Sequence, residues 1–310
     1  MINYNEYREI LEAKEVTIHN LLKHFKKNEI DYDAYGNIYI NFKKETKELP
    51  IFVAHLDNVL GEEDRKPVYS LDGKTIFCAN TVGIGFDDKA GIIAIIELWR
   101  SIPNKPFRII FTANEEVGGI GAEYVDAERM ERAAYILELD RKGGHDIIQT
   151  SGFTRLCSES FAKKWEELGF KRATGTFTDL NKFKPKIPKV EMCNLSIGYY
   201  NPHQKSEYLD IKEFENVIEK VKQFIIENKK KQFEDTEEFI EEQNNYGNYD
   251  YNYRNYQRFN DTMMSKCDCC GKYGITTWNE DIGMYLCDEC NDWYEDDLYK
   301  GGKNDNGSIQ

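Results

Sequence analysis

Short apolar runs recur along this chain, and several of them end in histidine or acidic residues. The runs at 49–56, 106–113 and 134–140 are typical of buried strands, whereas 88–102 is typical of a helix with a broad apolar face. Buried strands that alternate with helices predict a largely parallel sheet covered on both faces. In such a sheet, functional side chains gather where the carboxyl ends of the strands meet the loops. We therefore expect an α/β fold whose polar motifs share one edge.

The other segments up to residue 228 fit the same class. They predict a helix over 4–28, a hairpin or strand around Gly36, helices over 121–134 and 154–168, and a strand over 190–200. Asp210 and Glu213 form a capping-box pattern at the start of a last amphipathic helix. No secretion signal and no run of about 18 apolar residues is found, so the sequence predicts a soluble, cytoplasmic protein without a membrane span.

Five of the short segments supply side chains that can bind metal ions. They contain His55 and Asp57, Asp87 and Asp88, Glu115 and Glu116, Asp140, and His203. Each has an ordinary structural reading alone, such as a helix cap for the aspartate pair or a turn for Asp140. Together they offer two imidazoles and at least three carboxylates, a set that suits zinc, with manganese or cobalt as alternatives. Of the remaining histidines, His19 and His24 are interpreted as surface or packing residues.

The order of these motifs resembles that of the co-catalytic dinuclear zinc exopeptidases, the superfamily of peptidase T, aminoacylase and the zinc aminopeptidases. The shared elements are His-x-Asp, Gly-x-Asp-Asp-Lys-x-Gly, Glu-Glu-x-Gly-x-x-Gly-Ala, an aspartate and a late histidine, and they cover about residues 50–225. The resemblance implies a single-domain zinc-peptidase fold with a mixed, mostly parallel sheet between helices. It implies two Zn²⁺ ions, with Mn²⁺ or Co²⁺ as alternatives, and a peptide as substrate.

The resemblance also implies a role for each matching residue. Asp87 would bridge both zinc ions, His55 and Asp140 would complete one site, and Glu116 and His203 the other. Glu115 would be the general base, and Asp57 would orient His55. The Asp87–Asp88 peptide would be cis. Tyr199 or Tyr200 is a candidate for a hydrogen bond to the oxyanion, and the segment 174–183 resembles a family segment in which an aspartate, here Asp179, lines the pocket. The sequence around Asp140 departs from the family pattern, which makes the nearby His145 a candidate partner of a ligand or a rival ligand.

The predicted reaction is hydrolysis of a peptide bond by a water that two zinc ions activate, with Glu115 moving the proton. An aminopeptidase acting on short peptides is favoured, and a metal-dependent amidase, deacylase or carboxypeptidase of the same superfamily is the alternative. Relatives insert an extra domain before the bridging aspartate or before the late histidine. Only 31 residues separate His55 from Asp87 and 62 separate Asp140 from His203, so we expect no lid domain.

The end of the chain differs in composition from the rest. Cys267, Cys270, Cys287 and Cys290 form two C-x₂-C pairs, which predict a zinc-ribbon-like module with one structural Zn²⁺; Cys269 is a spare. Residues from 231 onward carry 7 Lys and Arg against 18 Asp and Glu, which argues against nucleic-acid binding and favours a protein partner. A binding module that works through this ribbon is the alternative from another functional class.

These features predict four regions. Residues 1–228 form the catalytic domain, 229–264 a low-complexity linker, 265–298 the zinc-ribbon-like module, and 299–310 a disordered tail.

Overall fold

The computed structural model describes residues 2–42, 48–60, 63–80, 82–228 and 233, together with the backbone of three strands after residue 261. The chain divides into two compact units, Met1–Glu242 and Gln243–Gln310. The four paired cysteines, Cys269, the tail 299–310 and most of the linker 229–264 lie outside the described residues.

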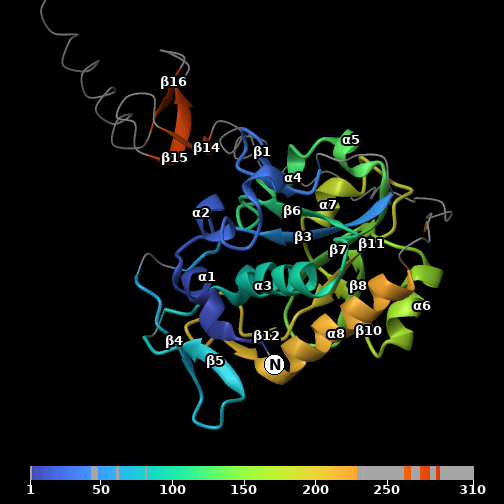
Figure 1. Ribbon diagram of the computed structural model, residues 1–310. Coiled ribbons are helices and arrows are strands. Elements are labelled where there is room, and N and C mark those ends of the chain that lie inside the picture. The colour runs from blue at the N-terminus through green and yellow to red at the C-terminus, as the bar shows by residue number, and fades with distance from the viewer. Residues whose placement is uncertain are drawn as a thin grey trace, which may run out of the picture. The chain divides into compact units, whose positions relative to one another are not determined.

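The larger unit is built on a nine-stranded sheet with the order β1-β2-β6-β3-β7-β11-β8-β10, in which β9 pairs with β8 (Figure 1). The strands are β1 (Ile30–Tyr32), β2 (Ile38–Ile40), β3 (Leu49–His55), β6 (Arg108–Thr112), β7 (Ala133–Arg141), β8 (Asp146–Ser151), β9 (Thr154–Arg155), β10 (Lys171–Gly175) and β11 (Met192–Ser196). Strands β6, β3, β7 and β11 run parallel to one another, so their carboxyl ends share one edge. The predicted mixed α/β sheet is confirmed.

Helices cover both faces of this sheet (Figure 1). They are η1 (Tyr4–Tyr7), α1 (Arg8–Glu12), α2 (Ile18–Leu21), η2 (Lys27–Glu29), α3 (Phe86–Ser101), α4 (Ile120–Glu123), α5 (Ala127–Met130), α6 (Glu159–Glu167), α7 (Leu180–Phe183) and α8 (Ile211–Glu227). Side chains of β3 alternate between two cores: Phe52 packs with α3 and α8, whereas Val53 packs with α4, α5 and α7. None of the described helices is long and apolar enough to cross a membrane.

Helix α3 occupies the centre of one core and starts at the candidate site. It contacts β3, β7 and α8, and its residues from Ile92 to Ile96 are all buried. A helix that is apolar on every side needs such complete enclosure. Because Asp87 and Asp88 lie in its first turn, the packing of α3 places both carboxylates at the edge where β3 and β7 end.

A second, four-stranded antiparallel sheet brings distant segments to the same region. Its order is β12-β13-β5-β4, with β4 (Pro67–Tyr69), β5 (Thr75–Cys78), β12 (Tyr199–Tyr200) and β13 (Tyr208–Asp210). Strands β4 and β5 come from the connection between His55 and Asp87, and β12 and β13 flank the segment with His203. Between Asp140 and His203, the chain forms strands and helices of the larger unit.

Four predicted elements differ from the structure. The helix expected over 154–168 begins only at Glu159, as α6, and Thr154–Arg155 form β9 instead. The helix expected over 4–28 is broken, because the chain becomes extended at Ala13 and Val16 then donates its N–H to the Leu56 carbonyl. The helix expected over 121–134 divides into α4 and α5. The strand expected over 190–200 divides between the two sheets at Gly198, whose φ of 87° requires a turn.

The smaller unit contains an antiparallel sheet of β14 (Thr262–Lys266), β15 (Tyr273–Asn279) and β16 (Met284–Leu286). Strands β14 and β16 both pair with β15, so they run in the same direction.

Candidate metal centre

The parallel strands bring the predicted ligands together at one edge. His55 is the last residue of β3 and is fully enclosed. Its Nε2 lies 3.0 Å from Asp87 Oδ1, 3.7 Å from Asp140 Oδ1 and 4.0 Å from Glu115 Oε2. Residues from β3, β7, α3 and the loop after β6 therefore converge on a single imidazole nitrogen.

Asp87 lies between the two predicted histidine ligands. Its Oδ1 faces His55, and its Oδ2 lies 3.1 Å from Nε2 of His203, which the segment between β12 and β13 supplies. Burial opposes ionisation of this carboxyl group, but the two imidazoles outweigh that effect and hold the pKa of Asp87 below its usual value. This is the arrangement expected of a carboxylate that bridges two ions. The peptide between Asp87 and Asp88 is cis, as the motif resemblance implies.

The two glutamates after β6 point to different partners. Glu116 Oε1 lies 3.1 Å from His203 Nε2, whereas Glu115 Oε2 lies on the side of His55. The chain turns sharply after them, since Gly118 and Gly119 have φ values of 101° and 70°. The motif assigns these two neighbouring carboxylates to different tasks.

Asp57 holds this turn in place. Its carboxylate accepts the N–H groups of Glu115 at 3.0 Å and Glu116 at 3.1 Å. The Nδ1 of His55 contacts the backbone oxygen of Asp57 at 3.0 Å, and the Asp57 carboxylate is farther away at 3.6 Å. Asp57 therefore orients His55 through its carbonyl and the two glutamates through its side chain, a second task that the motif does not reveal.

Asp140 at the end of β7 is fixed by β11 and β12. Tyr199 donates its hydroxyl to Asp140 Oδ1 at 3.1 Å, while Asn194 hydrogen-bonds both backbone groups of Asp140 at 3.0 Å. Tyr200 is directed elsewhere and hydrogen-bonds Glu213. Of the two predicted tyrosines, only Tyr199 thus contacts a predicted ligand. Asn194 was not predicted, because no local sequence signal marks a β-strand asparagine as a partner of the neighbouring strand.

Asp88, predicted only as the neighbour of the bridging residue, also contributes. One carboxylate oxygen accepts the His55 N–H at 3.2 Å and the other accepts the Gly91 N–H at 2.9 Å. Asp88, His55 and Asp140 have potential ligand atoms within 4.8 Å of one another, and so do His55, Asp87 and Glu116. The group of His55, Asp87 and Glu116 thus contains residues that the motif resemblance assigns to two different ion sites.

The carboxylates of the site outnumber its two imidazoles, His55 and His203. Burial, followed by repulsion from Asp87, raises the pKa of Glu116 to about 7 and that of Asp140 to about 7. Burial, together with repulsion from groups such as Asp140, raises the pKa of Glu115 to about 9. Divalent cations would stabilise the ionised forms, so the donor set and its electrostatics fit a dinuclear metal centre.

Two further predicted residues differ in their burial. Asp179 is fully buried behind the Gly119 turn, where a Cβ added to Gly119 would lie 3.1 Å from Asp179 Oδ1. Burial raises the pKa of Asp179 to about 6. His145 is exposed, and its Nε2 lies 3.8 Å from Glu213.

Comparison with other proteins supports the fold. No protein-family model matches the chain. The chain is 30% identical over 141 residues to the uncharacterized protein YqjE of Bacillus subtilis (strain 168), and the match covers 41% of this chain and 36% of YqjE. It therefore spans little more than a third of that relative.

Solved structures of peptidases share the architecture. Aminopeptidase PepT from Bacillus cereus superposes with a TM-score of 0.59 at 17% identity, covering 71% of this chain and 96% of PepT. A tripeptidase from Staphylococcus aureus gives 0.57 at 15% identity over 71% and 96%. The Pyrococcus horikoshii TET1 peptidase gives 0.55 at 16% identity over 71% and 98%. The chain thus has the fold of the PepT and TET peptidases, as its motifs predicted.

Proposed function

We propose that this protein is a metal-dependent aminopeptidase that acts on short peptides. The observation that carries the proposal is the position of Asp87 between His55 and His203, with Asp140 and Glu116 on either side. Similar folds that are named as an aminopeptidase and a tripeptidase favour this reaction and substrate class.

The side chains present divide the work of hydrolysis. His55, Asp87, Glu116, Asp140 and His203 would hold two ions, with Zn²⁺ favoured over Mn²⁺ and Co²⁺. When bound, such ions polarise the scissile carbonyl and make water a better nucleophile at neutral pH. Glu115 lies beside the cluster without being needed as a ligand, so it takes the proton of the attacking water and delivers it to the leaving amine. Of the two candidate tyrosines, Tyr199 is the one that contacts a proposed ligand, Asp140, so we assign to it the hydrogen bond to the developing oxyanion.

The decisive variant is Glu115→Gln, which keeps the shape of the side chain and removes the base. Activity on a peptide panel is expected to fall by roughly 10²–10⁴-fold, while the metal content stays unchanged. Glu123→Gln is the matched control, since Glu123 lies on α4 in an ion pair with Lys182. A Glu115→Gln protein as active as wild type would refute the proposed role.

Metal dependence and cleavage polarity are tested on the same protein. A chelator is expected to abolish activity, and Zn²⁺, Mn²⁺ or Co²⁺ to restore it, because bound ions would polarise the scissile carbonyl and activate the attacking water. Free-amine peptides, peptides with a blocked amino end and N-acyl amino acids are then compared. If only the blocked peptides or the N-acyl amino acids are cleaved, the protein is a carboxypeptidase or a deacylase and not an aminopeptidase.

For the smaller unit, we propose that Cys267, Cys270, Cys287 and Cys290 bind one structural Zn²⁺ and that the resulting module contacts a protein partner. The spacing of the cysteines and the direction of the strands support this. The two pairs begin directly after the carboxyl ends of β14 and β16, which run in the same direction. Two C-x₂-C pairs supply the four thiolates that tetrahedral zinc prefers.

A further inference from the structure

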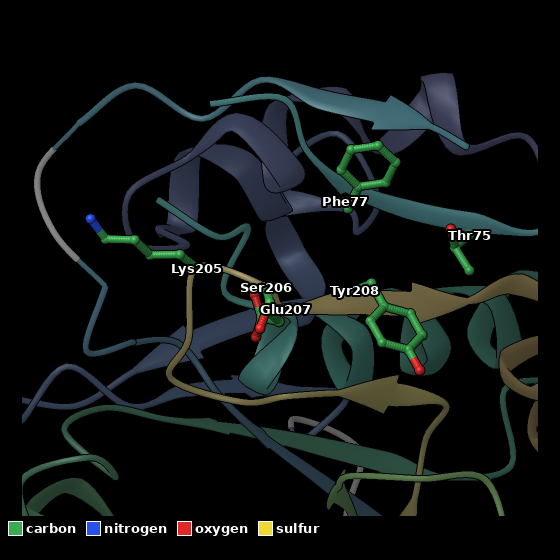
Figure 2. A pocket seen from close by; sticks show the side chains of 6 residues that line it. All are labelled: Thr75, Phe77, Lys205, Ser206, Glu207 and Tyr208. Atoms are coloured by element: carbon green, nitrogen blue, oxygen red, sulfur yellow. The ribbon is translucent and has the colours of Figure 1, made fainter. Parts of the chain in front are cut away.

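A buried carboxylate on the segment with His203 holds the turn that leads to Asp87. Glu207 is 1% exposed, and its Oε2 accepts the N–H groups of Ile84 at 3.1 Å and Gly85 at 2.6 Å. Its Oε1 accepts the N–H of Asp87 at 3.3 Å. Figure 2 shows Glu207 next to Ser206 on the hairpin, at a cavity of about 310 Å³.

The same turn is held from its other side by Lys89. The Nζ of Lys89 is buried and donates to the Ile84 carbonyl at 2.6 Å, and it also contacts the carbonyls of Leu11 and Ala13. Ile84 therefore gives its N–H to Glu207 and receives a hydrogen bond on its C=O from Lys89. Because residues 82–85 belong to no helix or strand, these side chains replace the backbone partners that a regular element would supply.

The two loops also pack directly on each other. Gly83 and Gly85 have φ values of 82° and 78°, and a Cβ added to Gly83 would lie 3.0 Å from the Gln204 carbonyl oxygen. The segment with His203 thus packs against the turn before Asp87. Glu207 connects these two segments, which are far apart in the sequence, through charge-assisted hydrogen bonds.

We infer that Glu207 is a positioning residue of the metal centre, which fixes the distance between His203 and Asp87. The inference rests on the proposed function only in taking these two residues as ligands. Glu207 touches neither imidazole nor ion, and it acts through the backbone of Ile84, Gly85 and Asp87. Hydrogen-bond partners of metal ligands commonly control affinity in this way.

Glu207→Gln tests the inference, because its amide NH₂ would face backbone donors and leave one acceptor where two are needed. Glu191→Gln is the matched control. Glu191 is equally buried, and it accepts the Ser158 N–H at 2.8 Å and the Ser158 hydroxyl, away from the predicted ligands. Both variants lose a buried charge-assisted hydrogen bond, so general destabilisation affects both.

The readout is Mn²⁺ binding to the chelator-treated full chain. Titration measures the affinity of the sites, and electron paramagnetic resonance measures the exchange-coupled signal of the ion pair. Manganese suits oxygen and nitrogen ligands and is a poor match for the C-terminal thiols. We expect Glu207→Gln to weaken at least one Mn²⁺ site by roughly 10–100-fold and to reduce the exchange-coupled signal of the ion pair, whereas Glu191→Gln keeps both. Wild-type binding in Glu207→Gln, or an equal loss in Glu191→Gln, would overturn the inference.

Two further measurements keep the outcomes distinct. If wild-type protein binds no more Mn²⁺ than His55→Ala, the metal centre itself is refuted and with it the proposed function. Amide hydrogen exchange needs no variant: the Gly85 N–H should exchange slowly despite lying outside every helix and strand, because Glu207 accepts it. Fast exchange of this N–H in the wild-type protein would contradict the anchoring by Glu207.

Discussion

At the scale of single residues, His24 links stability to pH independently of the metal centre. Its ring stacks on Tyr7 with centroids 5.4 Å apart, and its Nδ1 lies 2.9 Å from Nη2 of Arg100. Burial, and then the positive charge of Arg100, lowers the pKa of His24 from 6.5 to about 4. The imidazole is thus neutral in the folded protein and accepts a hydrogen bond from the guanidinium.

This lowered pKa predicts that acidification destabilises the fold through His24. The unfolded chain takes up the proton first, so the contribution is complete above about pH 6.5 and is lost as the pH falls towards about 4. Denaturant unfolding at a series of pH values measures it. The difference between wild type and His24→Gln should shrink on acidification, while His19→Gln, at an exposed position, should follow wild type. A constant difference for His24→Gln would contradict the pKa shift.

The convergence of the residues proposed as ligands was the most predictable part of the site, because each occupies a fixed place in a short motif. His55, Asp87 and Asp140 converge as the order of motifs implied. The task of the Asp57 carboxylate could not be predicted, since it depends on how the loop after β6 folds back over β3. The same holds for Glu207, which contacts a turn more than a hundred residues away.

At the scale of elements, helix α3 and strand β7 approach each other closely at Gly91. A Cβ there would lie 2.4 Å from the Leu139 carbonyl oxygen and 2.4 Å from Asp88 Oδ1. Helix α3 can lie directly on β7 only because this residue has no side chain.

We therefore predict that Gly91→Ala destabilises the protein. Alanine favours a helix over glycine by about 1 kcal/mol, but the forced displacement of α3 from β7 costs about 1–3 kcal/mol in overpacked cores, and here the clash is with backbone. The free energy of unfolding in urea should fall, whereas Ser101→Ala at the exposed end of α3 should change it little. Equal or greater stability of Gly91→Ala would show that the helix moves without penalty.

The element pattern was predictable where burial is uniform. The apolar runs that became β3, β6, β7 and α3 need no tertiary information, because only an enclosed strand or helix tolerates them. The prediction of one helix over 4–28 was wrong, because the hydrogen bond from the Val16 N–H to the Leu56 carbonyl competes with helical hydrogen bonding. The strands of the four-stranded sheet are short and half-exposed. Their alternation of buried and exposed residues is therefore too short to distinguish them from loops.

At the scale of the whole molecule, charge is distributed unevenly along the chain. The formal net charge is −14, and residues from 231 onward carry 7 Lys and Arg against 18 Asp and Glu, whereas residues 1–230 carry 34 against 37. A dinuclear centre in one unit and a thiolate site in the other would use different ligand chemistry, and their metal contents should therefore be separable.

Zinc counting on the intact protein tests this separation. We expect three Zn²⁺ ions per chain in wild type and two in a Cys267→Ser/Cys290→Ser variant, because loss of one thiolate from each C-x₂-C pair leaves too few ligands for a tetrahedral site. Peptide hydrolysis should be unchanged in this variant, since its ligands belong to the larger unit. Cys78→Ser, a cysteine of strand β5, is the control and should retain three ions. Three ions in the double variant would exclude the four-cysteine site, and a parallel loss of hydrolysis would show that the two units depend on each other.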